Sequence, residues 1–269
     1  MGRKAIVFGG CTNGNDAPLL INDVHYMDLN DPNNPVWCKM AIDDSSDIPA
    51  PRWRHSSTGI SDEEMLVWGG IGESARYNDS HLLKIEDENA FWQRLEPEGK
   101  VPTPRGYHTA TLIGRRIYVF GGYGGQGLRR KFNEEVHILD LDANTWLGKD
   151  QGFEEIREGG LFTEGTSPGI RGSHTACLIE KTFLCILGGR DSEQYLCDTH
   201  MLDIESMTWS QIQSFKNPEA PTRMCNHLAA GIQSVPSSFL FSFGGRRRTR
   251  RLGQNGVSAT MLTCLTVGA

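Results

Sequence analysis

The sequence lacks the features that mark secreted, membrane-spanning and nucleic-acid-coating proteins. No hydrophobic run approaches the roughly eighteen residues of a membrane-spanning helix, and no basic segment followed by an apolar one opens the chain. The seven cysteines form no CxxC pair, which favours free thiols in a reducing compartment over a disulfide framework. A net charge of -6 argues against a nucleic-acid coat. We therefore expect a cytoplasmic protein without membrane contact, and only the basic stretch RRRTRR leaves a nuclear location open.

The sequence also lacks the motifs of common enzymes. No serine or cysteine stands in a nucleophile-elbow pattern, and the glycine-rich GGYGGQG lacks the Lys-Ser or Lys-Thr that would hold a phosphate. Asp23 and His25 lie two residues apart, so on a strand they would share a face and could form half of a catalytic triad. The same pairing recurs at Asp79 and His81, Glu135 and His137, and Asp198 and His200. Because an active site is needed only once, the recurrence favours a structural role, and we predict no catalytic residue, metal ligand or cofactor.

Glycine, by contrast, is abundant, with 31 residues, and it recurs in pairs that end apolar runs such as KAIVFGG and RIYVFGG. The pairs are Gly9 and Gly10, Gly69 and Gly70, Gly121 and Gly122, Gly188 and Gly189, and Gly244 and Gly245. Strands normally avoid glycine, which has no side chain to pack and loses much backbone entropy on folding. Five copies of one strand ending therefore indicate a structural repeat.

Three other features accompany the glycine pairs. An arginine and a histidine precede the pair, an acid and a histidine follow it, and a tryptophan comes last. The arginines are Arg52, Arg105, Arg171 and Arg223, and the tryptophans are Trp37, Trp92, Trp146 and Trp209. Each unit thus contains four strand candidates separated by turn-rich segments, which predicts a four-stranded antiparallel sheet.

Such sheets can bury both faces by packing around an axis as a β-propeller. The glycine pairs would let neighbouring sheets approach closely near the axis, or would turn at positive φ. Each tryptophan would supply apolar area to the interface with the next sheet.

The combination of these features, over roughly residues 4 to 245, resembles the kelch repeat, and the fold it implies is similar to the central propeller of galactose oxidase. The resemblance implies an all-β propeller that is used mostly as a protein-binding platform. Some propellers of this kind are enzymes: copper oxidases use tyrosine, cysteine and paired histidines, and iron-dependent specifier proteins use Glu-x3-Asp-x3-His. Here Glu193, Asp198 and His200 come nearest to the second motif, with the wrong spacing.

We expect one domain over residues 1–269. Complete blades are predicted at 52–95, 105–148 and 171–212, with partial blades at 4–38 and 223–269. The resemblance implies six or seven blades, so the ring is expected to be incomplete. Residues 147–169 read as a long inter-blade loop in which Leu161 and Phe162 could anchor a partner. Residues 246–269 form an atypical C-terminal segment, without the acid–histidine pair and the tryptophan.

Arginines gather in the loops that a meander places at one end of its sheets, namely the loops into the first strand and those after the second. Partner-binding candidates are Arg52, Arg105, Arg171 and Arg223 in the first set, and Arg129, Arg130, Arg190, Arg246, Arg247 and Arg248 in the second. Guanidinium groups suit carboxylates and phosphates, which points to an acidic peptide or a chain terminus as ligand. The repeated arginines could equally be structural, and RRRTRR could be a solvated loop.

These observations predict a non-catalytic protein–protein interaction module, a scaffold or adaptor that binds a partner peptide through an arginine-bearing loop face. By resemblance, a ubiquitin-ligase component is a further partner class. Two alternatives stay open. One is an enzyme or a metal-dependent accessory protein on the same fold. The other is a binder of phosphate-rich ligands through RRRTRR, although nucleic acid is unlikely given the overall charge.

Overall fold

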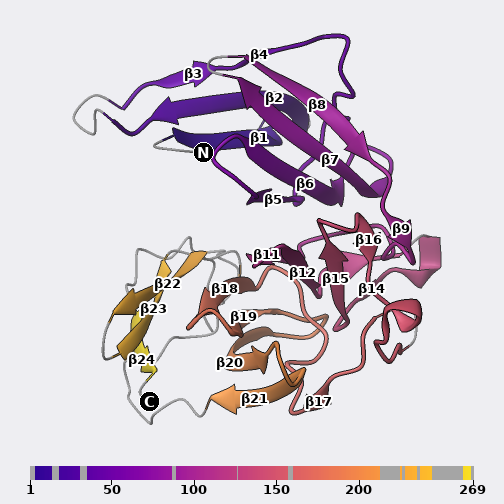
Figure 1. Cartoon of the computed structure of the whole chain (residues 1–269), viewed down its shortest axis with the longest axis vertical. Coiled ribbons are helices and arrows are strands. Elements are labelled where there is room, and N and C mark those ends of the chain that lie inside the picture. The colour runs from indigo at the N-terminus through magenta and orange to yellow at the C-terminus, as the bar shows by residue number, and fades with distance from the viewer. Residues whose placement is uncertain are drawn as a thin grey trace, which may run out of the picture.

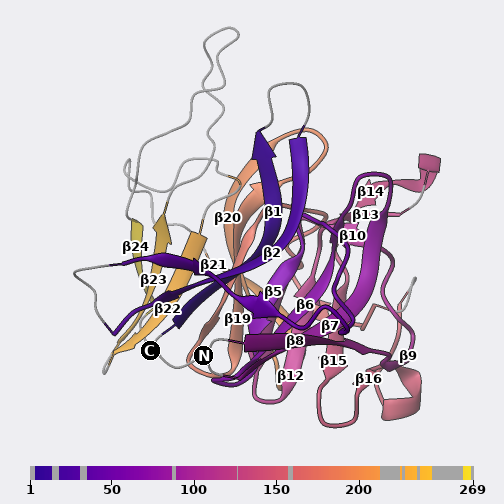
Figure 2. The same cartoon turned by 90° about the horizontal axis from the view of Figure 1, so that it is seen from above.

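The computed structural model of the chain describes residues 4–13, 18–30, 35–86, 89–125, 127–156, 160–212, 225, 228–234, 237–243 and 263–267. These residues form β-strands, turns and two short 3-10 helices, and they include no α-helix. Five sheets follow one another around a centre as blades (Figure 1), and a sixth, small sheet lies at one end of them (Figure 2). No helix in this described part is long and apolar enough to cross a membrane. The architecture confirms the expected all-β, kelch-type propeller with an incomplete ring.

The strands of each blade are antiparallel neighbours in chain order. Blade 1 contains β1 (Lys4–Asn13), β2 (Pro18–Asp28) and β3 (Trp37–Lys39). Blade 2 contains β5 (Ser56–Gly59), β6 (Glu64–Ile71), β7 (Arg76–Glu86) and β8 (Asn89–Leu95). Blade 3 contains β11 (Thr109–Ile113), β12 (Arg116–Phe120), β15 (Val136–Asp140) and β16 (Thr145–Trp146). Blade 4 contains β18 (Thr175–Ile179), β19 (Phe183–Arg190), β20 (Tyr195–Asp203) and β21 (Thr208–Ile212).

Blade 5 contains β22 (Leu228–Ser234), β23 (Ser237–Phe243) and β24 (Thr263–Val267). β24 pairs antiparallel with β23, so a third strand of this blade lies inside the segment that the sequence marks as atypical. The small sheet contains β10 (Arg105–Gly106), β13 (Tyr123–Gly124) and β14 (Lys131–Phe132). The two 3-10 helices are η1 (Gly127–Arg129), between β13 and β14, and η2 (Lys149–Gln151).

Each linker between the first four blades adds a short parallel strand to the blade that follows it. These strands are β4 (Ala41–Ile42) beside β8, β9 (Glu98–Gly99) beside β16, and β17 (Glu164–Gly165) beside β21. The linker must pass from the outer strand of one blade to the inner strand of the next, and pairing on its way satisfies an otherwise unpaired sheet edge. The predicted long loop at 147–169 is thus partly a strand.

The glycine pairs bring neighbouring blades together, as the sequence predicts. Gly121 has φ +63, and a Cβ on it would lie 2.7 Å from the carbonyl oxygen of Arg171 in blade 4. Directly after it, the N–H of Gly122 donates to that same oxygen at 2.8 Å. The pair therefore provides both a left-handed turn and an inter-blade hydrogen bond, and a side chain would obstruct the contact. Gly244 and Gly245 lie outside the described residues.

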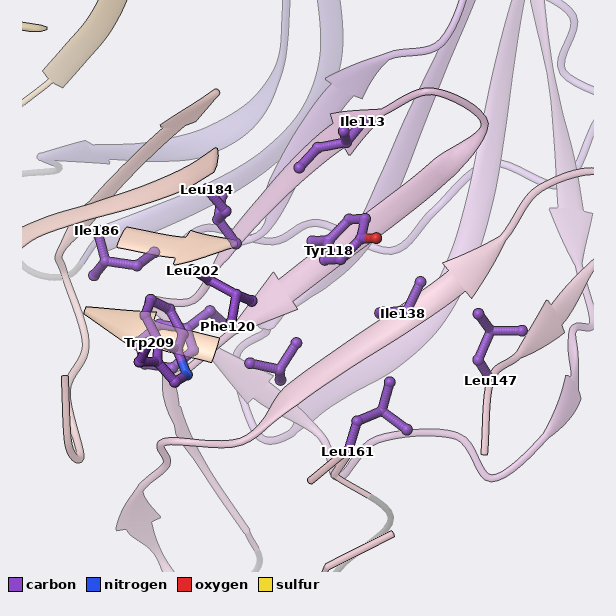
Figure 3. Close-up of a cluster of buried hydrophobic side chains, with 11 residues drawn as sticks. Ile113, Tyr118, Phe120, Ile138, Leu147, Leu161, Leu184, Ile186, Leu202 and Trp209 are labelled. Carbon is purple, nitrogen blue, oxygen red and sulfur yellow. The ribbon is translucent and has the colours of Figure 1, made fainter. Parts of the chain in front are cut away.

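Apolar side chains fill the spaces between blades (Figure 3 shows the cluster between blades 3 and 4). The tryptophans of the outer strands pack against the aromatic residue that precedes the glycine pair of the blade before. Ring centroids are 4.9 Å apart for Trp92 and Phe8, 5.5 Å for Trp146 and Trp68, and 5.3 Å for Trp209 and Phe120. The prediction that each tryptophan packs against the following blade is therefore wrong, since each packs against the preceding one. Alternation along a strand separates two faces but does not show which of them faces the preceding blade. Trp37 of blade 1 is exposed.

Candidate functional site

Arg52, Arg105 and Arg171 turn inward, and each ties its own blade together. Arg52 Nη1 donates to the carbonyl oxygen of Gly69 at 3.0 Å and to Asp79 Oδ1 at 2.6 Å, and its Nη2 donates to Asp79 Oδ2 at 2.9 Å. In blade 4, Arg171 makes the same contacts with Gly188 and with both oxygens of Asp198, each at 2.9 Å. The arginine thus joins the glycine pair of its blade to the acid of the following strand.

Blade 3 repeats this network with a longer acid. Arg105 Nη1 donates to the carbonyl oxygen of Gly121 at 3.0 Å, and its Nη2 donates to the hydroxyl of Thr103 at 2.9 Å. Glu135 stands where the other blades have aspartate, and its carboxylate lies 3.7 Å from Arg105. Glutamate has one more methylene than aspartate, and its ion pair with the arginine is longer than the bidentate contacts of Arg52 and Arg171.

Two of the acid–histidine pairs, in blades 2 and 4, belong to these same networks, whereas Asp23 of blade 1 pairs with Lys39 at 2.8 Å. His81 Nε2 lies 3.0 Å from Asp79 Oδ2, and His200 Nε2 lies 3.0 Å from Asp198 Oδ2. Burial by itself would raise the pKa of Asp79, but hydrogen bonds from His81 and Arg52 and the charge of Arg52 together lower it. The same causes lower the pKa of Asp198. Within the described residues, no group of three or more histidines, cysteines and acids is placed to hold a metal ion.

The assignment of the repeated arginines to a partner-binding rim is wrong for three of them. Arg52, Arg105 and Arg171 are only 1%, 0% and 1% exposed, because their guanidinium groups point to acids inside the blade. Arg129, Arg130 and Arg190 are exposed, as a binding role requires. Arg223, Arg246, Arg247 and Arg248 lie outside the described residues. Leu161 is also unsuited to anchor a partner, because it is buried and its N–H donates to the carbonyl oxygen of Val136 at 2.9 Å, whereas Phe162 is exposed.

A different set of residues lines the end of the propeller where these loops meet. Two positions after each repeated arginine come Arg54, Tyr107 and Ser173, each with a left-handed backbone at φ 55, 63 and 56. The N–H of Tyr107 donates to the carbonyl oxygen of Arg54 at 3.1 Å, and the N–H of Ser173 donates to that of Tyr107 at 2.9 Å. This chain of hydrogen bonds runs from blade to blade. The sequence signal for these residues is the position directly before each repeat histidine, which varies from one repeat to the next.

Arginines and aromatic rings alternate around this end. The guanidinium of Arg54 lies 5.0 Å from the ring of Trp53 and 4.9 Å from that of Tyr107. Arg76, at the start of β7, lies 5.0 Å from the ring of Tyr123. Arg190, at the end of β19, lies 5.6 Å from the ring of Phe132. Such contacts hold a guanidinium in place without neutralising its charge.

We call Arg54, Arg76, Arg130 and Arg190, with the rings of Trp53, Tyr107, Tyr123 and Phe132, the arginine–aromatic mouth. Burial and the nearby charge of Arg130 lower the pKa of Arg76, although Tyr123 and Tyr107 act in the opposite sense. The positive charge of Arg130 therefore acts on Arg76, although burial of Arg76 has the larger effect. Figure 2 shows β10, β13 and β14, which carry part of this set, beyond one end of the blades.

Two acidic residues of the inter-blade linkers, Asp47 and Glu155, contact outer strands and other linkers. The Asp47 carboxylate accepts a hydrogen bond from the backbone N–H of Arg94 on outer strand β8. Glu155 pairs with Lys100 at 3.9 Å and accepts from the N–H of Lys149. These two acids are therefore engaged beside outer strands and linkers.

Comparison with known proteins places this architecture in a family. The flagellar outer-arm dynein alpha chain of Chlamydomonas reinhardtii is 36% identical over 254 residues, which are 92% of this chain and 5% of the relative. Acyl-CoA-binding domain-containing protein 4 of Arabidopsis thaliana is 29% identical over 91% of this chain and 34% of the relative. Human host cell factor 2 is 31% identical over 80% of this chain and 29% of the relative.

The chain thus spans about a third or less of these relatives. The family described as the KLHDC2/KLHL20/DRC7 kelch-repeats domain matches residues 1–245. That range includes blades 2, 3 and 4, whose side chains form the networks and the mouth. Kelch-repeat domains are typically non-catalytic scaffolds for protein interaction. The chain belongs to the KLHDC2/KLHL20/DRC7 kelch-repeats domain family.

Proposed function

We propose that this chain is a non-catalytic protein-interaction module that binds an acidic peptide segment of a partner at the arginine–aromatic mouth. The observation that carries the proposal is that guanidinium groups are held over aromatic rings at this end, with that of Arg76 5.0 Å from the ring of Tyr123 and that of Arg190 5.6 Å from the ring of Phe132. Burial and, after it, repulsion between Arg76 and Arg130 lower the pKa of Arg76. A carboxylate placed between them would relieve this repulsion. The surrounding rings would contact the apolar part of the peptide.

The chemistry of the mouth favours a peptide over a small ligand. The cations come from the loops of three blades: Arg54 and Arg76 from blade 2, Arg130 from blade 3 and Arg190 from blade 4. Several separated carboxylates on one extended segment would match that spread. Guanidinium groups held over rings lose little side-chain freedom on binding, which favours affinity.

The test uses the full chain and two fluorescein-labelled peptides of the same length. One contains glutamate, aspartate and a single tyrosine, and the other has glutamine and asparagine in place of the acids. We expect the acidic peptide to bind and its neutral counterpart to bind at least tenfold more weakly. Arg76→Ala and Arg130→Ala should each weaken binding about 10- to 100-fold, since a charged hydrogen bond is worth about 1.5–3 kcal/mol.

Arg115→Ala is the matched control. Arg115 is an exposed arginine in the β11–β12 turn, whose ion pair with Asp142 spans 3.0 Å, and its loss changes the net charge equally. Equal weakening by Arg115→Ala would show attraction by overall charge alone and would overturn the proposal. Failure of the acidic peptide to bind at all would do the same.

A further inference from the structure

Two cysteines of blade 4, Cys177 on β18 and Cys185 on β19, are direct neighbours across the two inner strands. They are register partners in an antiparallel pair, so their side chains project from the same face of the sheet. Directly opposite residues of such a pair have Cα atoms about 4.5 or 5.5 Å apart, and disulfides span Cα distances of about 4.4–6.8 Å. The backbone of blade 4 therefore holds the two thiols at a separation that a disulfide can bridge.

The repeat does not require cysteine at these two positions. The same register position is occupied by Thr58 and Leu66 in blade 2, and by Thr111 and Tyr118 in blade 3. Blades 2 and 3 thus form the same strand pair without thiols. The packing of a blade therefore does not explain why blade 4 has two cysteines opposite each other, and their chemistry is the more informative property.

The surroundings of the two thiols differ. Cys185 is 1% exposed and packs with Leu187 and Met201, whereas Cys177 is only partly buried. A hydrogen bond between the thiols lowers the pKa of Cys177, against the effect of burial, and together with burial it raises the pKa of Cys185. Cys177 is therefore the thiol that solvent reaches and that ionises first, which makes it the more reactive of the two.

We propose that Cys177 and Cys185 form a reversible redox site, in which a small-molecule disulfide such as oxidised glutathione converts the free dithiol to a disulfide. The Cys177 thiolate attacks one sulfur of glutathione disulfide, which forms a mixed disulfide and releases one glutathione thiolate. The Cys185 thiol then loses its proton and attacks the Cys177 sulfur, which releases the second glutathione. Two protein thiols are thereby oxidised, one small-molecule disulfide is reduced, and the two protons pass to the glutathione thiolates.

The new bond would join the two inner strands of blade 4 on the face that carries Leu187. The opposite face of this sheet carries Ile186 and Trp209, which belong to the cluster between blades 3 and 4 (Figure 3). The face with the cysteines is therefore the one turned toward blade 5, whose β22 lies beside β18 (Figure 1). Oxidation would thus change blade 4 next to its neighbour in the propeller.

The first experiment equilibrates the full, reduced chain with mixtures of reduced and oxidised glutathione. The remaining thiols are then alkylated, and the peptides are mapped by mass spectrometry. Trypsin cleaves after arginine and lysine, so the two cysteines lie in separate peptides, 172–181 and 182–190. We expect these two peptides to be joined by a disulfide, and chemical reduction of the sample to separate them.

Three variants test the role of each thiol. Cys185→Ala should leave glutathione attached to Cys177, because no second thiol displaces it. Cys177→Ala should leave Cys185 unmodified, because the buried thiol does not meet the oxidant. Cys197→Ala is the matched control, since it removes an exposed cysteine on β20 of the same blade. It should form the linked peptides in the same yield as the wild type.

A second measurement needs no variant and tests whether the fold brings the two thiols together. The linked fraction at each ratio of the two glutathiones is measured for the folded wild type and for the same chain unfolded in urea. We expect the equilibrium constant for disulfide formation to be roughly tenfold larger or more in the folded chain, because the strand register holds both thiols in place.

Three results would overturn the proposal: glutathione on Cys177 of the wild type without the linked peptides, a link from Cys185 to any other cysteine, or an equilibrium constant no larger in the folded chain than in urea. A lower yield of the linked peptides in Cys197→Ala would also overturn it, since the exposed cysteine would then carry the first step.

Discussion

Arg52 and Arg54 lie two residues apart in the segment PRWRHS, and the structure gives them opposite roles. Arg52 is buried and holds Asp79 with two hydrogen bonds, whereas Arg54 is only partly buried and lies between two aromatic rings at the mouth. Both sit on the same short turn into the first strand of blade 2. The backbone separates them, because the left-handed conformation at Arg54 turns its side chain away from the direction that Arg52 takes. The comparison shows that an arginine's role here follows from its place in the repeat.

Arg52→Ala should cause the largest loss. It removes the Arg52 donors from the largely buried carboxylate of Asp79 and from the carbonyl oxygen of Gly69, and we expect the free energy of unfolding to fall by about 3 kcal/mol. Chemical denaturation measures this loss. Arg115→Ala, which removes an exposed ion pair, should cost about 0.5 kcal/mol at most. A loss below about 1 kcal/mol for Arg52→Ala would mean that the buried Arg52 contributes no more to stability than an exposed arginine such as Arg115.

The pH dependence of stability tests whether His55, next to the network around Arg52, stays uncharged in the folded chain. Burial and the charge of Arg52 lower the pKa of His55 to about 4, despite a hydrogen bond to the backbone of Phe8. Between about pH 6.5 and pH 4 the unfolded chain therefore binds a proton that the folded chain does not. His55 should contribute a fall in stability of about 3 kcal/mol as pH drops through this window.

The carboxylates act at lower pH. The pKa of Asp79 is lowered in the folded chain, so its contribution is present above about pH 4 and is lost as pH falls further. His55→Gln should reduce the fall in stability between about pH 6.5 and pH 4, leave the part due to His108, whose pKa burial and the charge of Arg105 also lower, and leave the step at lower pH. An unchanged profile between pH 6.5 and pH 4 in His55→Gln would contradict the assignment.

Gly121→Ala tests whether crowding between blades, beyond positive φ, requires glycine. The new Cβ would lie 2.7 Å from the carbonyl oxygen of Arg171, and we expect a loss of about 2–3 kcal/mol in thermal or chemical unfolding. Gly114 has nearly the same φ, +61, with nothing within 4 Å of its Cβ position. Gly114→Ala should therefore cost about 1 kcal/mol, and equal losses at the two sites would show that crowding contributes nothing.

Arg54→Ala should have the smallest effect on stability. A partly exposed cation–π contact contributes about 0.5–1 kcal/mol, so the unfolding midpoint should change little. Binding of the acidic peptide should weaken measurably in the same variant. Strong destabilisation by Arg54→Ala would make Arg54 a structural residue like Arg52, and the mouth would lose a member.

Several parts of the fold could be predicted from the sequence because they depend on local chemistry repeated along the chain. The glycine pairs predicted close approach of neighbouring blades, and Gly121 shows it. That Trp92 packs against the preceding blade could not be predicted, since alternation along a strand does not show which sheet face meets which neighbouring blade. The role of Arg54 could not be predicted, because the repeats have different residues at its position and no shared residue type marks it.

By itself, the sequence determined the repeat, the all-β class and the residues that make one blade resemble the next. These follow from strand alternation and from glycine's conformational freedom, which act over a few residues. Only the tertiary structure decided that Arg52 faces inward while Arg54 reaches the mouth, and that Trp37 stays exposed while Trp92 is buried. The reason is that each outcome depends on a group brought close by sheet stacking, such as Asp79 for Arg52 and Phe8 for Trp92. Within the described residues, no group of that kind covers Trp37, which is 49% exposed.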